Sequence, residues 1–159
     1  MTRAELLRRI QPDHRLLLDA SVLIAYLDGH EATSPIATVV LDELIGSGRN
    51  PAVISMVTVS ELLVRPLRVG ARQPFHHAHD FLTRFPHLSL ADVDIRVAQE
   101  AASIRAAHRL TMPDALTVAT GIVSQVSHLV TNDTAWRTRL APLSTRISTV
   151  VLSAPTQRT

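Results

Sequence analysis

Four acidic side chains, each close behind a short apolar run, are candidates for a shared metal site. They are Asp19 in LLLDASVLIAYLD, Glu61 in ISMVTVSELL, Asp114 in LTMPDALTVATG and Asp133 in LVTNDTAW. At ~4 Å and an effective dielectric constant of about 20, each pair of carboxylates repels by roughly 4 kcal/mol. Such a cluster either raises some of the carboxyl pKa values or binds a cation. Because the chain contains no Cys, ligation by oxygen alone favours a hard cation, Mg²⁺ or Mn²⁺.

A hard cation bound in this way predicts hydrolysis of a phosphodiester. Mg²⁺ keeps several of its water molecules in a protein site, and one of them can become the nucleophile. The neighbours Ser21, Thr131 and Asn132 supply two hydroxyls and an amide that can orient carboxylates and metal-bound water.

Each acid also has an ordinary structural explanation. Asp19 could cap a helix, Asp114 could stabilise a helix macrodipole, and Asp133 could form an Asx turn. Glu61 could be an exposed helix residue. The functional interpretation therefore depends on all four residues reaching the same edge of one sheet.

The elements that must position these residues alternate between strands and helices. This alternation predicts a three-layer α/β/α sandwich around a five-stranded, mainly parallel sheet. In such sheets the functional crevice lies at the carboxyl ends of the strands. Asp92 and Thr111 are the predicted N-caps of two later helices, with Asp114 in the first turn of the second. The predicted strands are 15–19, 52–54, 88–90, 128–131 and 147–152, and the predicted helices are 2–11, 21–27, 34–45, 56–67, 73–85, 92–110, 111–125 and 134–140.

Length and composition favour one globular domain. The chain has 159 residues, of which 46% are apolar and 19% charged, and this excludes a disordered chain. We expect a nuclease-like domain over 15–152, a helical extension over 1–14 and a tail over 153–159. No secretory signal is visible, and polar residues interrupt the longest uncharged run, 115–132, so we expect a soluble cytoplasmic protein without a membrane span.

The four motifs, in this order, resemble those of PIN-domain ribonucleases, and most of all the VapC-type toxins of toxin–antitoxin pairs. The resemblance covers about 16–152 and implies a five-stranded parallel α/β/α fold, a metal-dependent endoribonuclease, a homodimer and inhibition by a small antitoxin. It matches Asp19, Glu61, Asp114 and Asp133 to the acidic positions of the site, Thr131 to a hydroxyl residue two positions before the last acid, and Ser21 to a common hydroxyl residue after the first. Departures are Ala20, where many members have Thr or Ser, and Trp136, where Phe is frequent.

Arginines near the motifs are candidate contacts to RNA phosphates, or alternatively surface charges or antitoxin contacts. Arg65, Arg68 and Arg72 follow the Glu61 motif, and Arg137 and Arg139 follow Asp133. The net charge of +2 is too small to establish a nucleic-acid partner by itself. The apolar residues of 62–67 exceed one helical stripe, so some of them could face a partner. The HHAHD cluster at 76–80 is interpreted as a solvated helix face.

Two other functions fit the same residues. One is a PIN nuclease in RNA maturation, or acting on structured DNA, without a toxin role. The other is a non-catalytic RNA- or protein-binding module that keeps the acids for structure. A phosphatase with an aspartyl nucleophile is disfavoured, because Asp19-Ala20-Ser21 lacks the second Asp that such enzymes use as acid and base.

Overall fold

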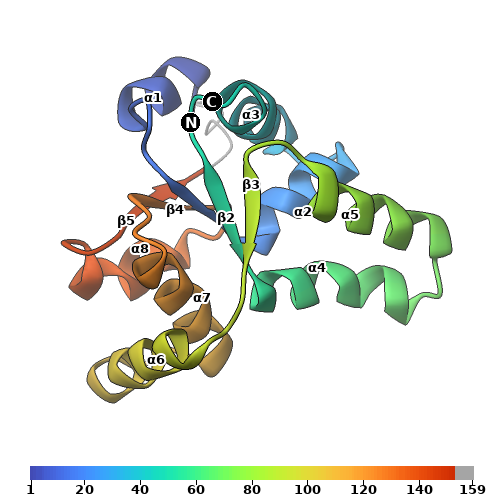
Figure 1. The fold of residues 1–159 in the computed structure, drawn as a ribbon. Helices are drawn as coiled ribbons and strands as arrows, with labels where there is room; N and C mark the ends of the chain where they lie inside the picture. Colours follow the sequence, from blue (N-terminus) through green and yellow to red (C-terminus); the bar gives the residue numbers. More distant parts are fainter. Residues whose placement is uncertain (153–159) are drawn as a thin grey trace, which may run out of the picture.

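A parallel five-stranded sheet forms the centre of the molecule, with helices on both faces (Figure 1). The structure is a computed structural model that describes residues 1–152; the predicted tail, 153–159, lies outside the described residues. The strand order is β3-β2-β1-β4-β5 and all four pairings are parallel. The predicted fold class is therefore confirmed. The strands are β1 (Leu16–Leu18), β2 (Ala52–Ser55), β3 (Leu88–Ala91), β4 (His128–Thr131) and β5 (Ser148–Val151).

Consecutive residues of the central strands point to opposite faces of the sheet, which explains why these strands are apolar throughout. In β1, Leu16 and Leu18 belong to one core and Leu17 belongs to the other, and all three are fully buried. The first core is covered by α1 (Arg3–Arg9), α2 (Ala20–Asp28), α3 (Ser34–Thr38), η1 (Val39–Gly46), α4 (Met56–Arg68) and α5 (Arg72–Arg84). The second is covered by α6 (Ile95–Ala107), α7 (Met112–Val123), α8 (Ala135–Arg139) and the 3₁₀ turn η2 (Ala141–Leu143).

The N-terminal helix α1 packs into the first core. Thr2 and Glu5 form a reciprocal capping box at its start. Leu6 and Ile10 are fully buried, and Arg9 donates a hydrogen bond to the carbonyl of Thr149 in β5 at 2.7 Å. The side chain of Asn50, before β2, donates to the carbonyls of Gln11 and His14. These contacts attach 1–14 to the sheet.

Two helix predictions need correction. The Asp92 cap is wrong: Asp94 is the N-cap of α6 and accepts a hydrogen bond from the Val97 amide at 3.0 Å. The helix begins at Ile95, and residues 92–94 lie between β3 and α6 outside any helix or strand, with Asp94 in an extended conformation. The predicted single α-helix over 34–45 changes into the wider π-helical η1, as the hydrogen bond from the Ser47 amide to the Asp42 carbonyl shows.

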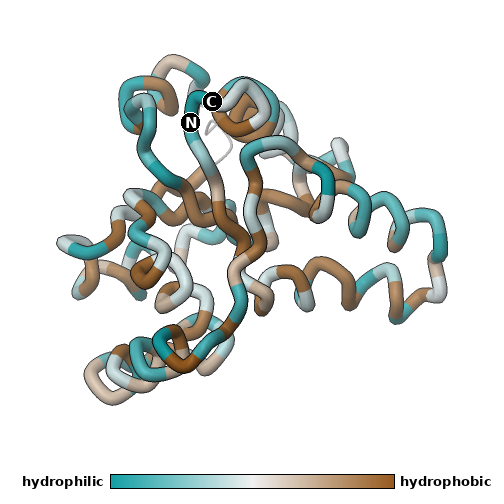
Figure 2. The backbone as a smooth tube through the Cα atoms, viewed as in Figure 1, coloured by the Kyte–Doolittle hydropathy of each residue, from teal (hydrophilic) through white to brown (hydrophobic). Residues whose placement is uncertain are grey.

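The hairpin of α4 and α5 extends away from the sheet (Figure 1). Apolar residues continue along α4 to its outer end, while α5 is largely hydrophilic (Figure 2). Leu62 is buried, but Val64, Leu67 and Val69 are exposed, so part of the apolar excess faces outward. The HHAHD histidines lie exposed on α5, which confirms the solvated face. No helix within residues 1–152 is long and apolar enough to cross a membrane.

A histidine pair lies at the amino ends of the central strands. His14 Nδ1 and His128 Nε2 are 2.8 Å apart. His128 is buried, and burial, followed by the charges of His14 and Arg9, lowers its pKa to about 4. His128 is therefore neutral in the folded protein at physiological pH.

We expect this neutral histidine to make the fold acid-sensitive. The ordinary His pKa near 6.5 applies to the unfolded chain, so stability is fully present above that pH and declines as the pH falls towards about 4. The loss is at most about 3 kcal/mol. Thermal unfolding at pH 7.5 and 4.5 checks this against His128→Gln, which should show a smaller decline. An equal decline in both proteins would contradict it.

Candidate active site

Asp19 lies at the carboxyl end of β1, the central strand from which the sheet extends to β2 and β3 on one side and to β4 and β5 on the other. β1 pairs with β2 on one side and with β4 on the other, and this switch point is where open α/β sheets form crevices. Asp19 directly follows β1 and occupies the N-cap position of α2, yet its side chain makes no capping hydrogen bond. The capping explanation for this carboxylate therefore fails.

Two hydroxyls hold the Asp19 carboxylate from two different strands. Ser21 Oγ donates to Asp19 Oδ2 at 2.6 Å, and Thr131 Oγ1, at the end of β4, donates to the same oxygen at 2.7 Å. Each hydroxyl also accepts a backbone N–H: Ser21 from Asn132 at 3.0 Å, and Thr131 from Asp133 at 3.0 Å. Both hydroxyl protons thus point to Oδ2, and no hydrogen bond from residues 1–152 reaches Oδ1 of Asp19.

Asn132 completes the connection between β1 and β4. Its side-chain nitrogen donates to the Ser21 carbonyl at 2.9 Å. Its Oδ1 is buried and has no hydrogen-bond partner among the described residues. Ser21, Thr131 and Asn132, predicted from the sequence as the residues that orient the acids, therefore all lie against Asp19 or against one another.

Removing the Thr131 hydroxyl is expected to loosen this connection. Thr131 is fully buried, and Thr131→Val keeps its shape but leaves the Asp133 amide without its acceptor. We expect a loss of about 1–3 kcal/mol in the free energy of unfolding, because the part-buried Asp133 amide and Asp19 Oδ2 each lose a hydrogen-bond partner. Urea denaturation measures it. Thr83→Val, on the exposed face of α5, is the control and should lose less than about 0.5 kcal/mol; equal losses would contradict the role of Thr131.

Asp114 approaches the same region from the first turn of α7, and Asp133 from the short connection between β4 and α8. Thr111 caps α7 by accepting from the Asp114 amide at 3.3 Å, which places Asp114 in the first turn as predicted. Asp133 Oδ1 accepts from the Ala135 amide at 2.9 Å, which is the Asx turn predicted as its structural role, but Oδ2 takes no part in that turn.

A cation from the chain itself bridges these two acids. Arg139 Nη1 lies 3.4 Å from Asp114 Oδ2 and 3.7 Å from Asp133 Oδ2. From the sequence, Arg137 and Arg139 were both predicted to contact RNA phosphates. The contact of Arg139 with the acids was not predicted. Nothing in the sequence signals that contact, because Asp114 and Arg139 are 25 positions apart on different helices.

Glu61 lies on α4, where the charges of other acids affect its pKa. Partial burial, together with the negative charges of Asp19 and Asp114, raises the pKa of Glu61. Its side chain forms no ion pair or hydrogen bond within residues 1–152. The structure thus brings Asp19, Asp114 and Asp133 to one edge of the sheet with Glu61 close by. In that part of the chain, however, no three acidic or histidine side chains are already arranged to hold a metal ion.

The remaining arginines lie elsewhere. Arg65 and Arg68 are exposed on the outer half of α4, and Arg72 begins α5 at the outer end of the hairpin. Arg137 is exposed on α8 and lines a shallow hollow of about 340 Å³ together with Arg9. The structure therefore separates Arg137 from Arg139.

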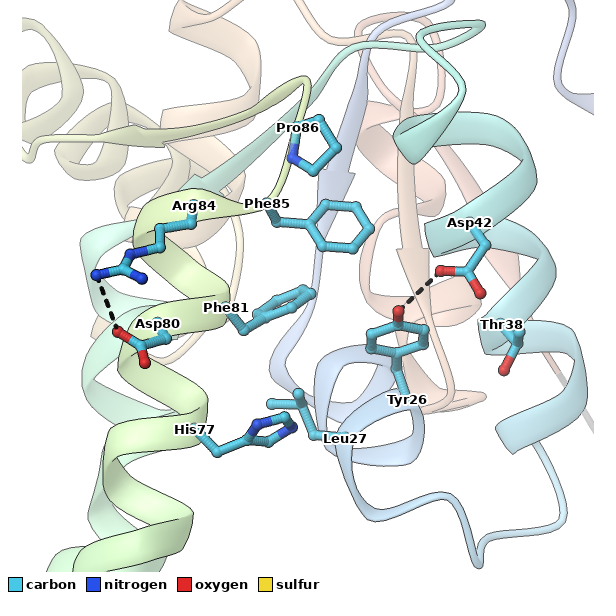
Figure 3. A pocket seen from close by; sticks show the side chains of 10 residues that line it. All are labelled: Tyr26, Leu27, Thr38, Asp42, His77, Asp80, Phe81, Arg84, Phe85 and Pro86. Carbon is cyan, nitrogen blue, oxygen red and sulfur yellow. Dashed lines mark hydrogen bonds and ion pairs between the residues drawn. The ribbon is translucent and has the colours of Figure 1, made fainter.

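A hollow lined by aromatic rings lies apart from the four acids. It has a volume of about 640 Å³ and lies between α2, η1 and α5, with the rings of Tyr26, Phe81 and Phe85 along its wall (Figure 3). Tyr26 donates to Asp42 Oδ1 at 2.8 Å, and burial and this carboxylate raise the pKa of Tyr26 to about 12. None of the four acids lines this hollow.

Comparisons with known proteins agree with this fold. The model of the PIN domain family matches residues 16–139. Among solved structures, a toxin–antitoxin complex from Klebsiella pneumoniae has a TM-score of 0.64 and 16% identity, over 88% of this chain and 99% of that one. VapBC2 from Rickettsia felis, bound to a DNA fragment from its promoter, has a TM-score of 0.62 and 15% identity, over 79% and 92%.

A third similar structure is VapC20 from Mycobacterium tuberculosis, described as a toxin that cleaves the sarcin–ricin loop. It has a TM-score of 0.58 and 14% identity, over 72% of this chain and 86% of that one. No curated protein sequence matches this chain. At these identities the structural likeness establishes the fold, and the family model covers more than half of the sequence. The chain belongs to the PIN domain family.

Proposed function

We propose that this protein is a metal-dependent endoribonuclease that hydrolyses RNA phosphodiester bonds and acts as the toxin of a type II toxin–antitoxin pair. The observation that carries the proposal is the held carboxylate of Asp19 at the sheet switch point, with Asp114 and Asp133 beside it, in a chain of the PIN family. Asp19, Glu61, Asp114 and Asp133 are the proposed catalytic and metal-binding residues, with residues 15–152 as the nuclease domain.

The donor set fits Mg²⁺ or Mn²⁺. All four acids offer oxygen, the ligand atom that hard cations prefer. Hydrogen bonding directs Asp19 Oδ2 towards two hydroxyls and leaves Oδ1 available. The unpaired, buried Oδ1 of Asn132 is suited to accept from an ordered water molecule. Burial raises the pKa of Glu61 first, and the negative charges of Asp19 and Asp114 raise it further. A cation bound among these carboxylates would offset that repulsion.

The residues of the chain have separate roles in this hydrolysis. Ser21 and Thr131 fix the Asp19 carboxylate between β1 and β4, so that it does not have to reorganise when it acquires a ligand. Asp114, in the first turn of α7, and Asp133, between β4 and α8, would supply further carboxylate oxygens. When bound, a divalent cation supplies water of lowered pKa and stabilises charge on the phosphate. The exposed Arg65, Arg68, Arg72 and Arg137 are the proposed contacts to RNA phosphates outside the site.

Protein partners are part of the proposal. The similar structure from Klebsiella pneumoniae is described as a toxin–antitoxin complex, which supports a small cognate antitoxin for this chain. We also propose a homodimer. Exposed Val64 and Leu67 on α4, Val69 directly after this helix, and the aromatic hollow of Figure 3 are apolar surfaces that such partners could cover.

A cleavage assay tests the activity. Purified protein is incubated with a panel of transfer, ribosomal and messenger RNA in Mg²⁺, in Mn²⁺ and in EDTA, beside Asp114→Asn. Cleavage that needs the metal and is lost in the variant supports a nuclease, and growth arrest on expression supports the toxin role. Cleavage without growth arrest would favour RNA maturation instead. Absence of cleavage, together with no Mn²⁺ binding by calorimetry, would contradict the proposal and favour a binding module.

A further inference from the structure

Arg139 is the one cation among residues 1–152 that forms an ion pair with the proposed metal ligands. It is the last residue of α8, and its guanidinium carbon lies 5.7 Å from the centre of the Trp136 ring. Trp136 is only 4% exposed and belongs to the second core, so the position of its ring is fixed by packing. Arg139 is therefore held beside the acids by an aromatic contact as well as by their charge.

The ion pairs of Arg139 are weak enough to be exchanged. Both are long, at 3.4 Å and 3.7 Å, and the side chains of Arg139 and Asp133 are 43% and 44% exposed. Ion pairs in such surroundings contribute up to about 1 kcal/mol each. A divalent cation carries twice the charge of the guanidinium and can approach carboxylate oxygens more closely, so it competes for the same oxygens. A bound metal ion therefore weakens the ion pairs of Arg139, and these ion pairs weaken metal binding.

A displaced Arg139 would remain next to the site, because the Trp136 ring and the short α8 helix anchor its base. Guanidinium matches phosphate in shape and charge and can donate two parallel hydrogen bonds. The neighbouring Arg137 cannot replace it, since Arg137 lines the hollow with Arg9 and makes no contact with the acids.

We propose that Arg139 has two successive roles at this site: it is the internal counter-ion that a divalent cation must displace, and after displacement it binds the phosphodiester of the RNA substrate. The inference rests on the proposed nuclease function. Beyond that function, the Arg139 guanidinium competes with the metal for the carboxylate oxygens. The same side chain couples metal binding to substrate binding.

The two roles predict opposite effects of one substitution. Arg139→Gln should tighten Mn²⁺ binding by roughly threefold to tenfold, because up to two weak ion pairs no longer compete. The same variant should raise KM for RNA at saturating Mn²⁺ by at least about threefold, and it should reduce the salt dependence of KM by about one phosphate contact. A purely structural tether between α7 and α8 would instead weaken both kinds of binding when it is removed.

Isothermal titration calorimetry with Mn²⁺, in the absence of RNA, measures the first effect, and cleavage kinetics at several salt concentrations measure the second. Arg8→Gln, an exposed arginine of α1 that contacts none of the four acids, is the matched charge control and should change Mn²⁺ affinity less than twofold. Thermal unfolding in EDTA verifies that each variant is folded. Arg139→Lys, which keeps the charge, should bind Mn²⁺ with an affinity between those of the wild type and Arg139→Gln.

Tighter metal binding together with a higher KM in Arg139→Gln would support the inference. Unchanged metal affinity in Arg139→Gln, or weaker binding of both metal and RNA, would overturn the inference about Arg139. The proposed function would still stand if the wild-type protein binds Mn²⁺ and cleaves RNA. A wild-type protein that neither binds Mn²⁺ nor cleaves RNA would overturn the proposed function first, and this inference with it.

Discussion

Asp19→Asn is expected to reduce metal-dependent RNA cleavage by at least about a hundredfold, because it removes the charge of a proposed metal ligand. In metal sites, mutating even the residues that orient the ligands lowers metal affinity or activity by about 10–100-fold. The fold should survive, since the Asn carbonyl oxygen can accept the same hydrogen bonds from Ser21 and Thr131. Initial cleavage rates at fixed Mn²⁺ measure the effect. Circular dichroism and thermal unfolding establish that the variant is folded.

The matched control for Asp19→Asn is Asp28→Asn. Asp28 ends the same helix that Asp19 precedes, and it is exposed and far from the acids along α2. It should keep wild-type activity. Calorimetry adds an independent measurement, because Asp19→Asn should bind Mn²⁺ more weakly in the absence of RNA. A folded Asp19→Asn variant with full, still metal-dependent activity would show that Asp19 is not a ligand.

The largest effect on stability is expected from Leu17→Ala in the central strand β1. Leu17 is fully buried and packs against α7, where its Cδ2 lies only 2.8 Å from the position that a Cβ on Gly121 would occupy. Truncating a buried leucine costs about 2–5 kcal/mol through lost burial and the cavity left behind. This is a large part of the 5–15 kcal/mol that is typical of a whole domain. Chemical denaturation with urea measures the loss.

Two further variants make the Leu17 prediction specific. Leu67→Ala, at a position that is 62% exposed on α4, should change the free energy of unfolding by less than about 0.5 kcal/mol. Gly121→Ala introduced together with Leu17→Ala places a methyl group in the vacated space, so the double variant should be more stable than the sum of the single effects by roughly 1 kcal/mol. Strict additivity would show that Leu17 and Gly121 are not packed as described.

The physical origin of the site is the parallel topology. Parallel strands place all their carboxyl ends at one edge, so Asp19 after β1 and Asp133 after β4 meet although they are more than a hundred positions apart. The backbone reinforces this arrangement, because the Asp19 amide donates to the Val130 carbonyl at 3.0 Å. The acids are therefore held near one another by the sheet, against their mutual repulsion.

The sequence by itself determined the order of the strands and helices and most of their positions. Three consecutive leucines predicted a buried central strand, Thr111 predicted the cap that places Asp114 in a first turn, and the four motifs in order predicted the PIN fold. The strand and the cap are local signals, because they depend on apolar runs and on hydrogen bonds between residues a few positions apart. The PIN fold was implied by the resemblance of the four motifs to that family.

Only the tertiary structure decided how those residues meet. Both Asp92 and Asp94 are residue types that cap helices, and in the structure Asp94 makes the capping hydrogen bond. The convergence of Ser21 and Thr131 on one oxygen of Asp19 depends on β1 pairing with β4, and the contact of Arg139 with Asp114 depends on how α8 packs beside α7. Strand order and helix packing arise from contacts across the whole core. For that reason a local pattern identifies the acids but not the cation placed among them.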